Sequence, residues 1–497
     1  MNKLSHFFRS HPRLINRPLE IVPGAFSWSL LTAPFWASFI WPHYIAYFVL
    51  FFDIYWLYRS MSFAYYFTNG FIRLRAQENI DWRKASEDIP GWKKVHHVII
   101  IPTFKEPLHI LNRTFKALAD QQIHKTQLSL ILATEARDAD ALGKADALQK
   151  EYSGRFANFW VTVHPDIEGE VKGKSSNMSW AAKWAKQKLV DGMGMDINDI
   201  TVTSCDADSR IHRKYFASLT YHFLQDPHRF YRFWQAPVVY YANIWRVPLP
   251  VRIVATFSST WSIAKAMRED KQINYSTYSL SLKLAHETGY WSVDVIPEDY
   301  HMFLKAFFRL GEKVVVKSIF LPVYADAAES RNYWSTMQNQ YKQLQRWAWG
   351  VTDDPYAIKK FFLRSKLPLL PRFMRTARLL EDHFLWPVNW FILTIGAVIP
   401  PLINPLFAET IIGYNLPRFA WWIITSTSVF FVIVLILDSF IRPPRPAGIG
   451  VHKLPLMYLQ WLTLPIVGFF FSALPAMDAH TRLMLGKYLE YRVTEKV

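Results

Sequence analysis

Two aspartates one residue apart follow a short apolar segment in the middle of the chain. Residues 200–204 read ITVTS, which is typical of a buried strand, and Asp206 and Asp208 come directly after them. Carboxylate oxygens are ligands that Mg²⁺ and Mn²⁺ prefer, and either ion can bridge a diphosphate and offset the charge of a leaving group. A solvated acidic turn would use the same residues, but the preceding strand favours a metal site. Cys205 is expected to be a buried core residue and not a nucleophile.

A second acidic pair opens a predicted helix that runs from Tyr300 to Leu310. Pro297 precedes Glu298 and Asp299, and a proline followed by acids in the first turn is ordinary helix-start chemistry. The functional interpretation makes Asp299 a general base that takes a proton from an acceptor hydroxyl, with Glu298 as the second candidate.

Three polar or aromatic residues share one face of another predicted helix, in the segment NQYKQLQRWAWG. Gln343, Arg346 and Trp347 are three and four residues apart. An amide, a guanidinium and an indole on one face can hydrogen-bond a glycan, bind phosphate and stack on a sugar ring. A helix at a membrane interface would present the same residues to lipid headgroups.

Further candidate donor-binding residues lie at a helix start and at the end of the first predicted strand. Lys174 and Asn177 begin an amphipathic helix, where a lysine and free backbone N–H groups can contact phosphate. A serine N-cap in the same segment would explain these residues equally well. Thr103 and Glu106 close the first strand and are expected to frame a nucleotide pocket.

The segment Phe233 to Pro237 supplies a candidate acceptor site. It reads FWQAP, and we expect Trp234 and Gln235 to form an aromatic floor under an acceptor sugar.

The elements that must position these residues alternate regularly between about Val95 and Gly350. Short β-branched runs alternate with helical segments, and repeated βαβ units predict a parallel sheet that is covered by helices on both faces. Such a sheet binds ligands at the carboxyl ends of its strands, where the candidate residues lie. The expected fold class is therefore α/β.

Apolar runs at both ends of the chain predict membrane helices on either side of this α/β region. Of the 497 residues, 51% are hydrophobic, and five runs are about as long as a membrane span requires. They cover residues 24–41, 44–71, 384–403, 419–437 and 454–477, the last interrupted by Pro465 and expected to be re-entrant or broken there. The predicted organisation is a cytosolic segment and hairpin (1–85), the α/β domain (86–350), basic amphipathic interface helices (351–380) and a second membrane block with a basic tail (381–497).

The charge pattern predicts where the protein lies. Lys and Arg exceed Asp and Glu, 57 to 40, and many basic residues flank the apolar runs, which orients the α/β domain toward the cytosol as part of a multi-pass plasma (inner) membrane protein. Anionic lipid explains this charge, so no nucleic-acid partner is expected. The single cysteine excludes an intrachain disulfide and a cysteine-based zinc site.

The order of these motifs resembles family 2 glycosyltransferases of the membrane polysaccharide synthase type, which include cellulose, hyaluronan and poly-N-acetylglucosamine synthases. The resemblance covers nearly the whole chain and implies a GT-A fold and an inverting, metal-dependent transfer from a UDP-sugar. Four motifs carry it: Asp206 and Asp208 match D-x-D, Asp299 matches the last residue of T-E-D, Gln343, Arg346 and Trp347 match Q-x-x-R-W, and Lys174 with Asn177 match a K-A-x-N-like segment.

The chain departs from this family pattern in three places. Residues 133–136 read ATEA where the family carries D-D-G-S, so Glu135 is the donor-binding candidate there, and Pro297 replaces the threonine of T-E-D. We expect no regulatory domain after the last membrane segment, which argues against close kinship with cellulose synthases controlled by cyclic-di-GMP.

Three functions are compatible with these observations. The favoured one is sugar transfer to a growing polysaccharide, with Mg²⁺ or Mn²⁺ as cofactor and export subunits unknown. The second is transfer of a single sugar to a polyprenyl-phosphate or other lipid acceptor. The third is a membrane transporter or nucleotide-sensing scaffold, which the scarcity of ionisable residues in the apolar runs disfavours.

Overall fold

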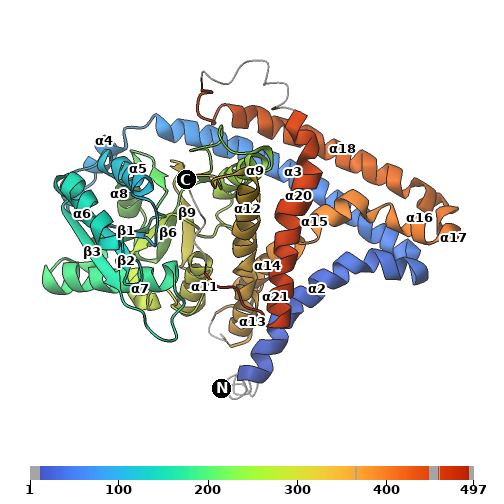
Figure 1. The fold of residues 1–497 in the computed structure, drawn as a ribbon, viewed down its shortest axis with the longest axis horizontal. Coiled ribbons are helices and arrows are strands. Elements are labelled where there is room, and N and C mark those ends of the chain that lie inside the picture. The colour runs from blue at the N-terminus through green and yellow to red at the C-terminus, as the bar shows by residue number, and fades with distance from the viewer. Residues whose placement is uncertain (1–11, 364–366, 447–456, 458, 492–497) are drawn as a thin grey trace. The chain divides into compact units, whose positions relative to one another are not determined.

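The computed structural model describes residues 12–363, 367–446, 457 and 459–491, and it divides into two compact units (Figure 1). Among the described residues, the α/β unit contains Gly70–Ile244, Lys265–Ser330 and residues 490–491, and the helical unit contains the rest. The helix at the end of the predicted α/β domain therefore belongs to the helical unit, as does Trp245–Ala264. Each unit is described by itself below.

The α/β unit is built on a seven-stranded sheet with the order β3-β2-β1-β4-β8-β6-β9. Its strands are β1 (His96–Pro102), β2 (Leu128–Glu135), β3 (Asn158–His164), β4 (Ile200–Ser204), β6 (Arg232–Gln235), β8 (Tyr278–Ser281) and β9 (Val315–Ser318). Strands β1, β2 and β4 are buried along their whole length, as their high content of apolar and β-branched residues predicts.

The sheet is mixed, which corrects the expectation of a purely parallel one. Strands β3, β2, β1 and β4 are parallel, and β6 is parallel to β9. Strand β8 runs antiparallel to both β4 and β6. It occupies the place beside β4 that a further βαβ unit would have filled with a parallel strand.

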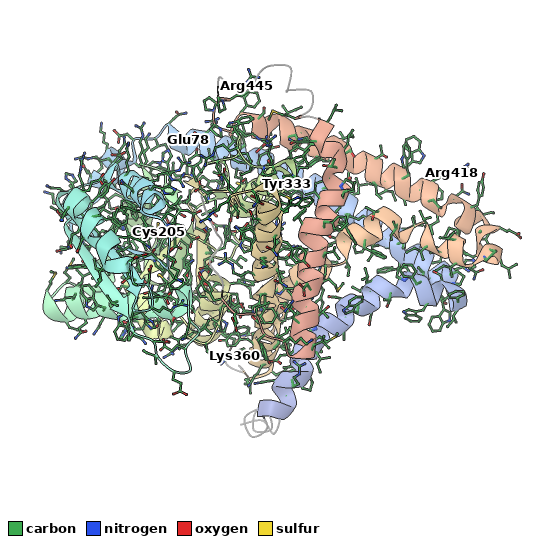
Figure 2. All side chains as sticks on the ribbon, viewed as in Figure 1. Glu78, Cys205, Tyr333, Lys360, Arg418 and Arg445 are labelled. Atoms are coloured by element: carbon green, nitrogen blue, oxygen red, sulfur yellow. The ribbon has the colours of Figure 1, made fainter. Side chains whose placement is uncertain are left out.

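The helices of the α/β unit follow the predicted alternation. Helices α6 and α7 pack against the parallel strands. The helices are α4 (Trp82–Glu87), α5 (Leu108–Ala119), α6 (Ala141–Tyr152), α7 (Lys174–Lys186), α8 (Tyr215–Gln225), α10 (Leu282–Thr288) and α11 (Glu298–Leu310). A small second sheet, β5 (Arg210–Ile211), β10 (Val323–Tyr324) and β7 (Val238–Val239), lies at the end of the unit's core cluster. Cys205 is fully buried in this core (Figure 2).

The helical unit contains the remaining helices, long and short. They are α2 (Pro12–Ile40), most of α3 (Pro42–Glu78), most of α9 (Leu249–Ala266), α12 (Tyr333–Ala348), α13 (Asp353–Leu363), α14 (Leu369–Leu385), α15 (Asn389–Phe391), α16 (Ile399–Ile403), α17 (Pro405–Ala408), α18 (Ile411–Ser439), α20 (Leu464–Gly468) and α21 (Leu474–Leu485). Helices α2 and α3, separated at Trp41, cover the predicted N-terminal runs 24–41 and 44–71, but neither helix is among the described runs that are long and apolar enough to cross a membrane. Residues 1–11 lie outside the described part.

In the described part of the chain, two helical runs are long and apolar enough to cross a membrane, Ile411–Ser439 and Gln460–Leu485. The second run overlaps the predicted segment 454–477, whose first residues lie mostly outside the described part. It is kinked at Phe471, where the backbone leaves helical geometry, and not at Pro465, which occupies the first turn of α20. A proline in the first turn of a helix breaks no hydrogen bond, because a backbone N–H at that position would have no partner within the helix.

Candidate active site

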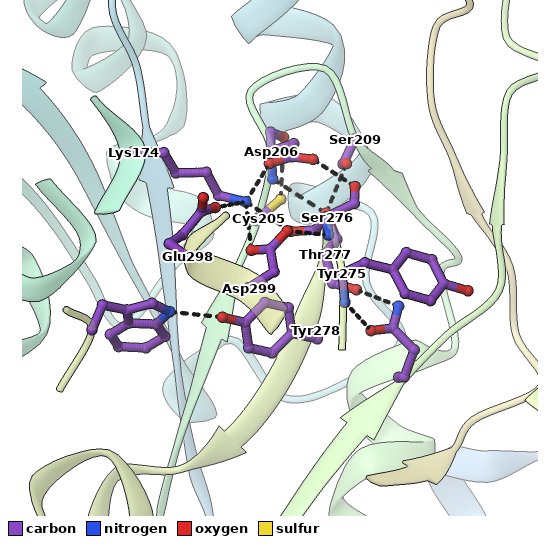
Figure 3. Close-up of polar contacts among 12 residues, drawn as sticks. Lys174, Cys205, Asp206, Ser209, Tyr275, Ser276, Thr277, Tyr278, Glu298 and Asp299 are labelled. Carbon is purple, nitrogen blue, oxygen red and sulfur yellow. Dashed lines mark hydrogen bonds and ion pairs between the residues drawn. The ribbon is translucent and has the colours of Figure 1, made fainter. Parts of the chain in front are cut away.

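The ammonium group of Lys174 lies among three carboxylates at the carboxyl ends of the strands (Figure 3). Its Nζ is 2.8 Å from Asp206 Oδ1, 2.9 Å from Glu298 Oε1 and 3.1 Å from Asp299 Oδ1. Lys174 is the first residue of α7, Asp206 follows β4, and the two acids open α11. Three elements far apart in the sequence thus bring together four of the predicted site residues.

Asp299 is fixed by the turn that precedes β8. Its Oδ2 accepts a hydrogen bond of 2.6 Å from the backbone N–H of Ser276, and its carbonyl oxygen accepts one of 2.6 Å from Asn274 Nδ2. Ser276 has φ 57°, in the left-handed region, which turns its N–H toward the carboxylate. Its hydroxyl also donates to Asp206 Oδ2, so a single residue orients both acids.

Burial and charge shift the pKa values of this cluster. Burial raises the pKa of Asp299 well above its usual range, and the negative charge of Glu298 raises it further. Burial alone would lower the pKa of Lys174, but the carboxylates of Asp206, Asp299 and Glu298 outweigh that effect and raise it. Lys174 is therefore a permanent cation, and Asp299 is a stronger base than an exposed aspartate.

Asp206 and Asp208 belong to two different hydrogen-bond networks. Asp206 is held by Lys174 and Ser276, whereas Asp208 Oδ2 accepts a bond of 3.3 Å from the backbone N–H of Asp326. Asp326 in turn forms an ion pair with Arg113. Among the described residues, no group of three or more His, Cys, Asp or Glu is arranged to hold a metal ion. Two hard carboxylates fit Mg²⁺ or Mn²⁺ only if a diphosphate supplies further oxygens.

The predicted nucleotide-binding residues line the same edge of the sheet, beyond β1 and β2. Thr103 Oγ1 donates to Glu106 Oε2 at 2.8 Å, which closes the turn after β1. Glu135, at the end of β2, pairs with Arg137, whose guanidinium carbon is 3.8 Å from the ring centre of Phe104. The two loops are therefore linked by one arginine.

A hollow opens beside these loops, between the ends of β2 and β3 and the start of α7. Its lining is mostly charged or polar and includes Glu135, Arg137, His164, Asp166, Glu170, Lys172 and Ser176. Asn177 is 1% exposed and donates 2.7 Å to the carbonyl of Ala133, so it ties α7 to β2 and does not face the hollow.

Serine does not cap the helix that begins here. The N-cap is Gly173, and Ser175 donates its hydroxyl to the carbonyl of Ser292.

The two residues expected to form an acceptor floor lie inside the α/β unit. Trp234 is 1% exposed, with its ring 5.5 Å from that of Phe223, which removes the open ring face that a sugar platform would need. Gln235 is fully buried, accepts from Tyr275 N–H at 2.9 Å and donates to the carbonyl of Thr277. It therefore supports the turn that holds Asp206 and Asp299.

The predicted Q-x-x-R-W segment lies on α12, in the helical unit. Gln343 is 8% exposed, and its Oε1 accepts 3.3 Å from Gln340 Nε2. Arg346 and Trp347 are half-buried on the same helix. The expected helix is confirmed, and these three residues belong to a different unit from the carboxylate cluster.

The residues that sequence reasoning missed are those of the turn from Asn274 to Thr277. Thr277 Oγ1 accepts from Asp206 N–H at 3.2 Å and lies 2.8 Å from Ser209 Oγ. Their signal was weak, because a short run of polar residues before a strand predicts a turn and nothing more.

A family model supplies an independent comparison. The model described as Glycosyl transferase family group 2 matches residues 201–437, just under half of the chain. The matched range includes Asp206, Asp208, Glu298, Asp299 and the Q-x-x-R-W helix. No curated protein matches the chain.

Similar solved structures have low sequence identity. One is a mannosyltransferase from Pyrobaculum calidifontis in complex with GDP-Man and Mn²⁺, 14% identical, covering 80% of this chain and 100% of its own, with a TM-score of 0.45. Another is TarS 1–349 from S. aureus in complex with UDP-GlcNAc, also 14% identical, covering 80% and 93%, with a TM-score of 0.40. The assignment of chemistry therefore rests on the family model and on the site itself.

Proposed function

We propose that this chain, a glycosyltransferase by its match to the family model, transfers a sugar from a nucleotide sugar to a growing polysaccharide at a membrane, with inversion at the sugar carbon. The observation that carries the proposal is the cluster of Lys174, Asp206, Glu298 and Asp299 at the carboxyl ends of the strands. It combines a base for the acceptor with carboxylates and a lysine that can position a metal-bound diphosphate.

In this reaction Asp299 removes the proton of an acceptor hydroxyl as its oxygen attacks the anomeric carbon of the donor sugar. The bond between that carbon and the diphosphate oxygen breaks in the same displacement, so the configuration inverts and no covalent enzyme intermediate forms. The fixed positions of Lys174 and Asp299 supply proximity and charge stabilisation. Asp208 and Asp206 would hold Mg²⁺ or Mn²⁺, which neutralises charge on the diphosphate when bound.

Asp299 suits the role of base better than Glu298. Its side chain is 20% exposed, whereas that of Glu298 is 7% exposed. A base must reach the hydroxyl that it deprotonates. The Ser276 N–H further fixes the orientation of Asp299, so its carboxylate does not have to be ordered at the moment of reaction.

The donor is proposed to be a UDP-sugar whose nucleotide lies along Thr103, Glu106, Glu135 and the hollow beside them. Charged and polar side chains at the rim of this hollow can hydrogen-bond a base or a ribose that lies across it. Lys174 lies where the diphosphate would meet the carboxylates, which agrees with the resemblance of its segment to the family's.

The membrane location is supported by the surface of the helical unit. Helix α18 exposes a band of large apolar side chains, among them Trp421, Trp422 and Val429, each at least 58% exposed. Leu369 and Leu370, at the start of the basic helix α14, are exposed by 64% and 67%. Such surfaces suit a bilayer and its interface. We therefore propose an inner-membrane protein with the α/β unit in the cytosol.

The acceptor separates the two remaining possibilities. The Q-x-x-R-W segment on α12 favours a polysaccharide, because an amide, a guanidinium and an indole can bind successive parts of a glycan. Transfer of one sugar to a lipid phosphate uses the same donor chemistry. Product size measured on lipid and oligosaccharide acceptors distinguishes them, and a product with a single added sugar would favour the lipid acceptor.

The test of the reaction is nucleotide release by detergent-purified protein with a panel of UDP- and GDP-sugars and Mg²⁺ or Mn²⁺. Release from one donor, lost with a chelator and in Asp299→Asn and Asp208→Ala, is the expected result. Folded protein that releases nucleotide from no donor, with acceptors present, would refute the proposal.

A further inference from the structure

The last described residues of the chain pack against the turn that precedes Lys174. A Cβ atom placed on Gly173 would lie 2.5, 2.6 and 3.0 Å from Cγ, Cδ1 and Cδ2 of Tyr491. The aromatic ring therefore lies directly on the α-carbon of Gly173, at a distance that leaves no room for a side chain. Both residues belong to the α/β unit.

The ring, and not the backbone, is what requires glycine here. Gly173 has φ 160° and ψ −161°, an extended conformation that other residues also adopt. No side chain at this position caps α7. The absence of a side chain therefore serves the contact with Tyr491.

The turn is also tied to the residues of the site. The N–H of Val171 donates 2.7 Å to the carbonyl of Val293, four residues before Pro297. Ser176 Oγ donates 2.7 Å to the carbonyl of Val171 and 3.1 Å to that of Gly173. Lys174 follows Gly173 directly, so a displacement of this turn moves the residue whose ammonium holds the three carboxylates.

The same turn borders the hollow proposed for the nucleotide. Lys172 and Ser176, on either side of Gly173, both line it. Tyr491 thus contacts a segment that borders the hollow and that leads directly into Lys174, which pairs with the carboxylates.

We infer that Tyr491 is a positioning residue for the transfer reaction. Its ring fixes Gly173, and through it Lys174 and the rim of the hollow, in the arrangement that receives the donor. The inference rests on the proposed function, because it assigns a role in donor binding. The contact with Gly173 involves the ring carbons Cγ, Cδ1 and Cδ2.

The direct test compares the KM for the nucleotide sugar in Tyr491→Ala and Tyr491→Phe. Without the ring, donor binding must order the turn, so the donor KM should rise about tenfold while kcat changes less. Tyr491→Phe keeps the ring on Gly173, so its donor KM should stay well below that of Tyr491→Ala. A general loss of folding would not give this split, and Tyr491→Leu replaces the alanine variant if the latter does not fold.

A double substitution tests whether the contact itself is responsible. Gly173→Ala alone should raise the donor KM, because the new Cβ pushes the ring away. Combined with Tyr491→Ala it should add little, because the ring is already gone. Gly143→Ala is the matched control, since a Cβ there meets nothing within 4 Å.

The outcomes separate the two proposals. A wild-type KM in Tyr491→Ala, or fully additive losses in the double variant, would overturn the inference while the proposed function stands. A wild-type protein that turns over no nucleotide sugar would instead refute the proposed function.

Discussion

Replacing Lys174 by methionine removes the charge at the centre of the site while keeping most of the side-chain volume. Lys174 is 10% exposed and lies within 3.1 Å of three carboxylates. The variant leaves Asp206, Glu298 and Asp299 together with no cation between them. We expect the free energy of unfolding of the α/β unit to fall, by an amount that depends on pH.

The size of the loss follows from two limits. Removing one partner of a buried ion pair costs about 3–5 kcal/mol when the other partner stays charged. A carboxyl group can avoid that cost by taking up a proton, which costs about 4 kcal/mol at pH 7 for an ordinary pKa near 4 and about 1.4 kcal/mol at pH 5. We therefore expect a loss of about 3–4 kcal/mol near pH 7 and about 1–2 kcal/mol near pH 5.

The sign of this pH dependence is fixed by proton linkage. Near neutral pH the folded variant binds a proton that its unfolded chain does not bind, so its stability decreases as pH rises. The effect is smaller in the wild type, because Lys174 lowers the pKa of Asp299 and so opposes part of the increase that burial and Glu298 cause. The deficit of the variant should therefore shrink on acidification.

Denaturant unfolding followed by tryptophan fluorescence at the two pH values measures the deficit. Lys172→Met is the matched control, because Lys172 pairs with Asp166 at 2.7 Å while both side chains are more than half exposed. An exposed pair of this kind should contribute nothing measurable. If the Lys174→Met deficit is the same at both pH values, or if the control loses as much, the argument from buried charge is refuted.

Three other predictions follow from the site and the core. Asp299→Asn should lower kcat by about 10²–10⁴-fold and leave donor affinity unchanged, whereas Glu298→Gln should retain more activity. Equal losses of kcat in the two variants would contradict the choice of Asp299 over Glu298 as the base. In wild type, kcat/KM should rise with pH, and the apparent pKa of this rise should lie above the ordinary aspartate value of about 3.9 because burial raises the pKa of Asp299. A pH–rate profile with an apparent pKa at the ordinary value would exclude Asp299 as the base. Burial lowers the pKa of His97 to about 3. The free energy of unfolding should therefore fall by about 1.4 kcal/mol per pH unit as pH decreases below about 6.5. Acid-unfolding experiments should show a weaker pH dependence for His97→Gln.

The first half of the sheet was predictable because its strands are short runs rich in apolar and β-branched residues. Three segments are rich in β-branched residues and are flanked by segments with helical periodicity, namely residues 96–102, 128–135 and 200–204. This alternation is the pattern of buried parallel strands. The direction of β8 was not predictable. Its four residues, YSLS, have no feature that distinguishes an antiparallel neighbour of β4 from a parallel one.

The acidic residues of the site were predictable and their supports were not. Asp206 and Asp299 stand at the end of a strand and the start of a helix, positions that pattern reasoning locates. Ser276 orients both through a left-handed backbone conformation at a residue that is not glycine. Such a conformation is imposed by the surrounding fold, so no local propensity indicates it.

Lys174 was predicted from the sequence to contact phosphate, but in the structure its ammonium group is paired with carboxylates. The way in which the site binds a diphosphate therefore needs a separate argument. Three carboxylates around one ammonium give the pocket an excess of negative charge, even if Asp299 carries a proton. A diphosphate brings more negative charge to this point, so its binding needs an added cation. We expect chelation of Mg²⁺ and Mn²⁺ to raise the donor Kd measured by calorimetry at least tenfold. Asp206→Asn removes one negative charge, so the Kd values with and without metal should differ less in this variant. Donor affinity that is equal with and without metal would show that Lys174 leaves the carboxylates to meet the diphosphate alone.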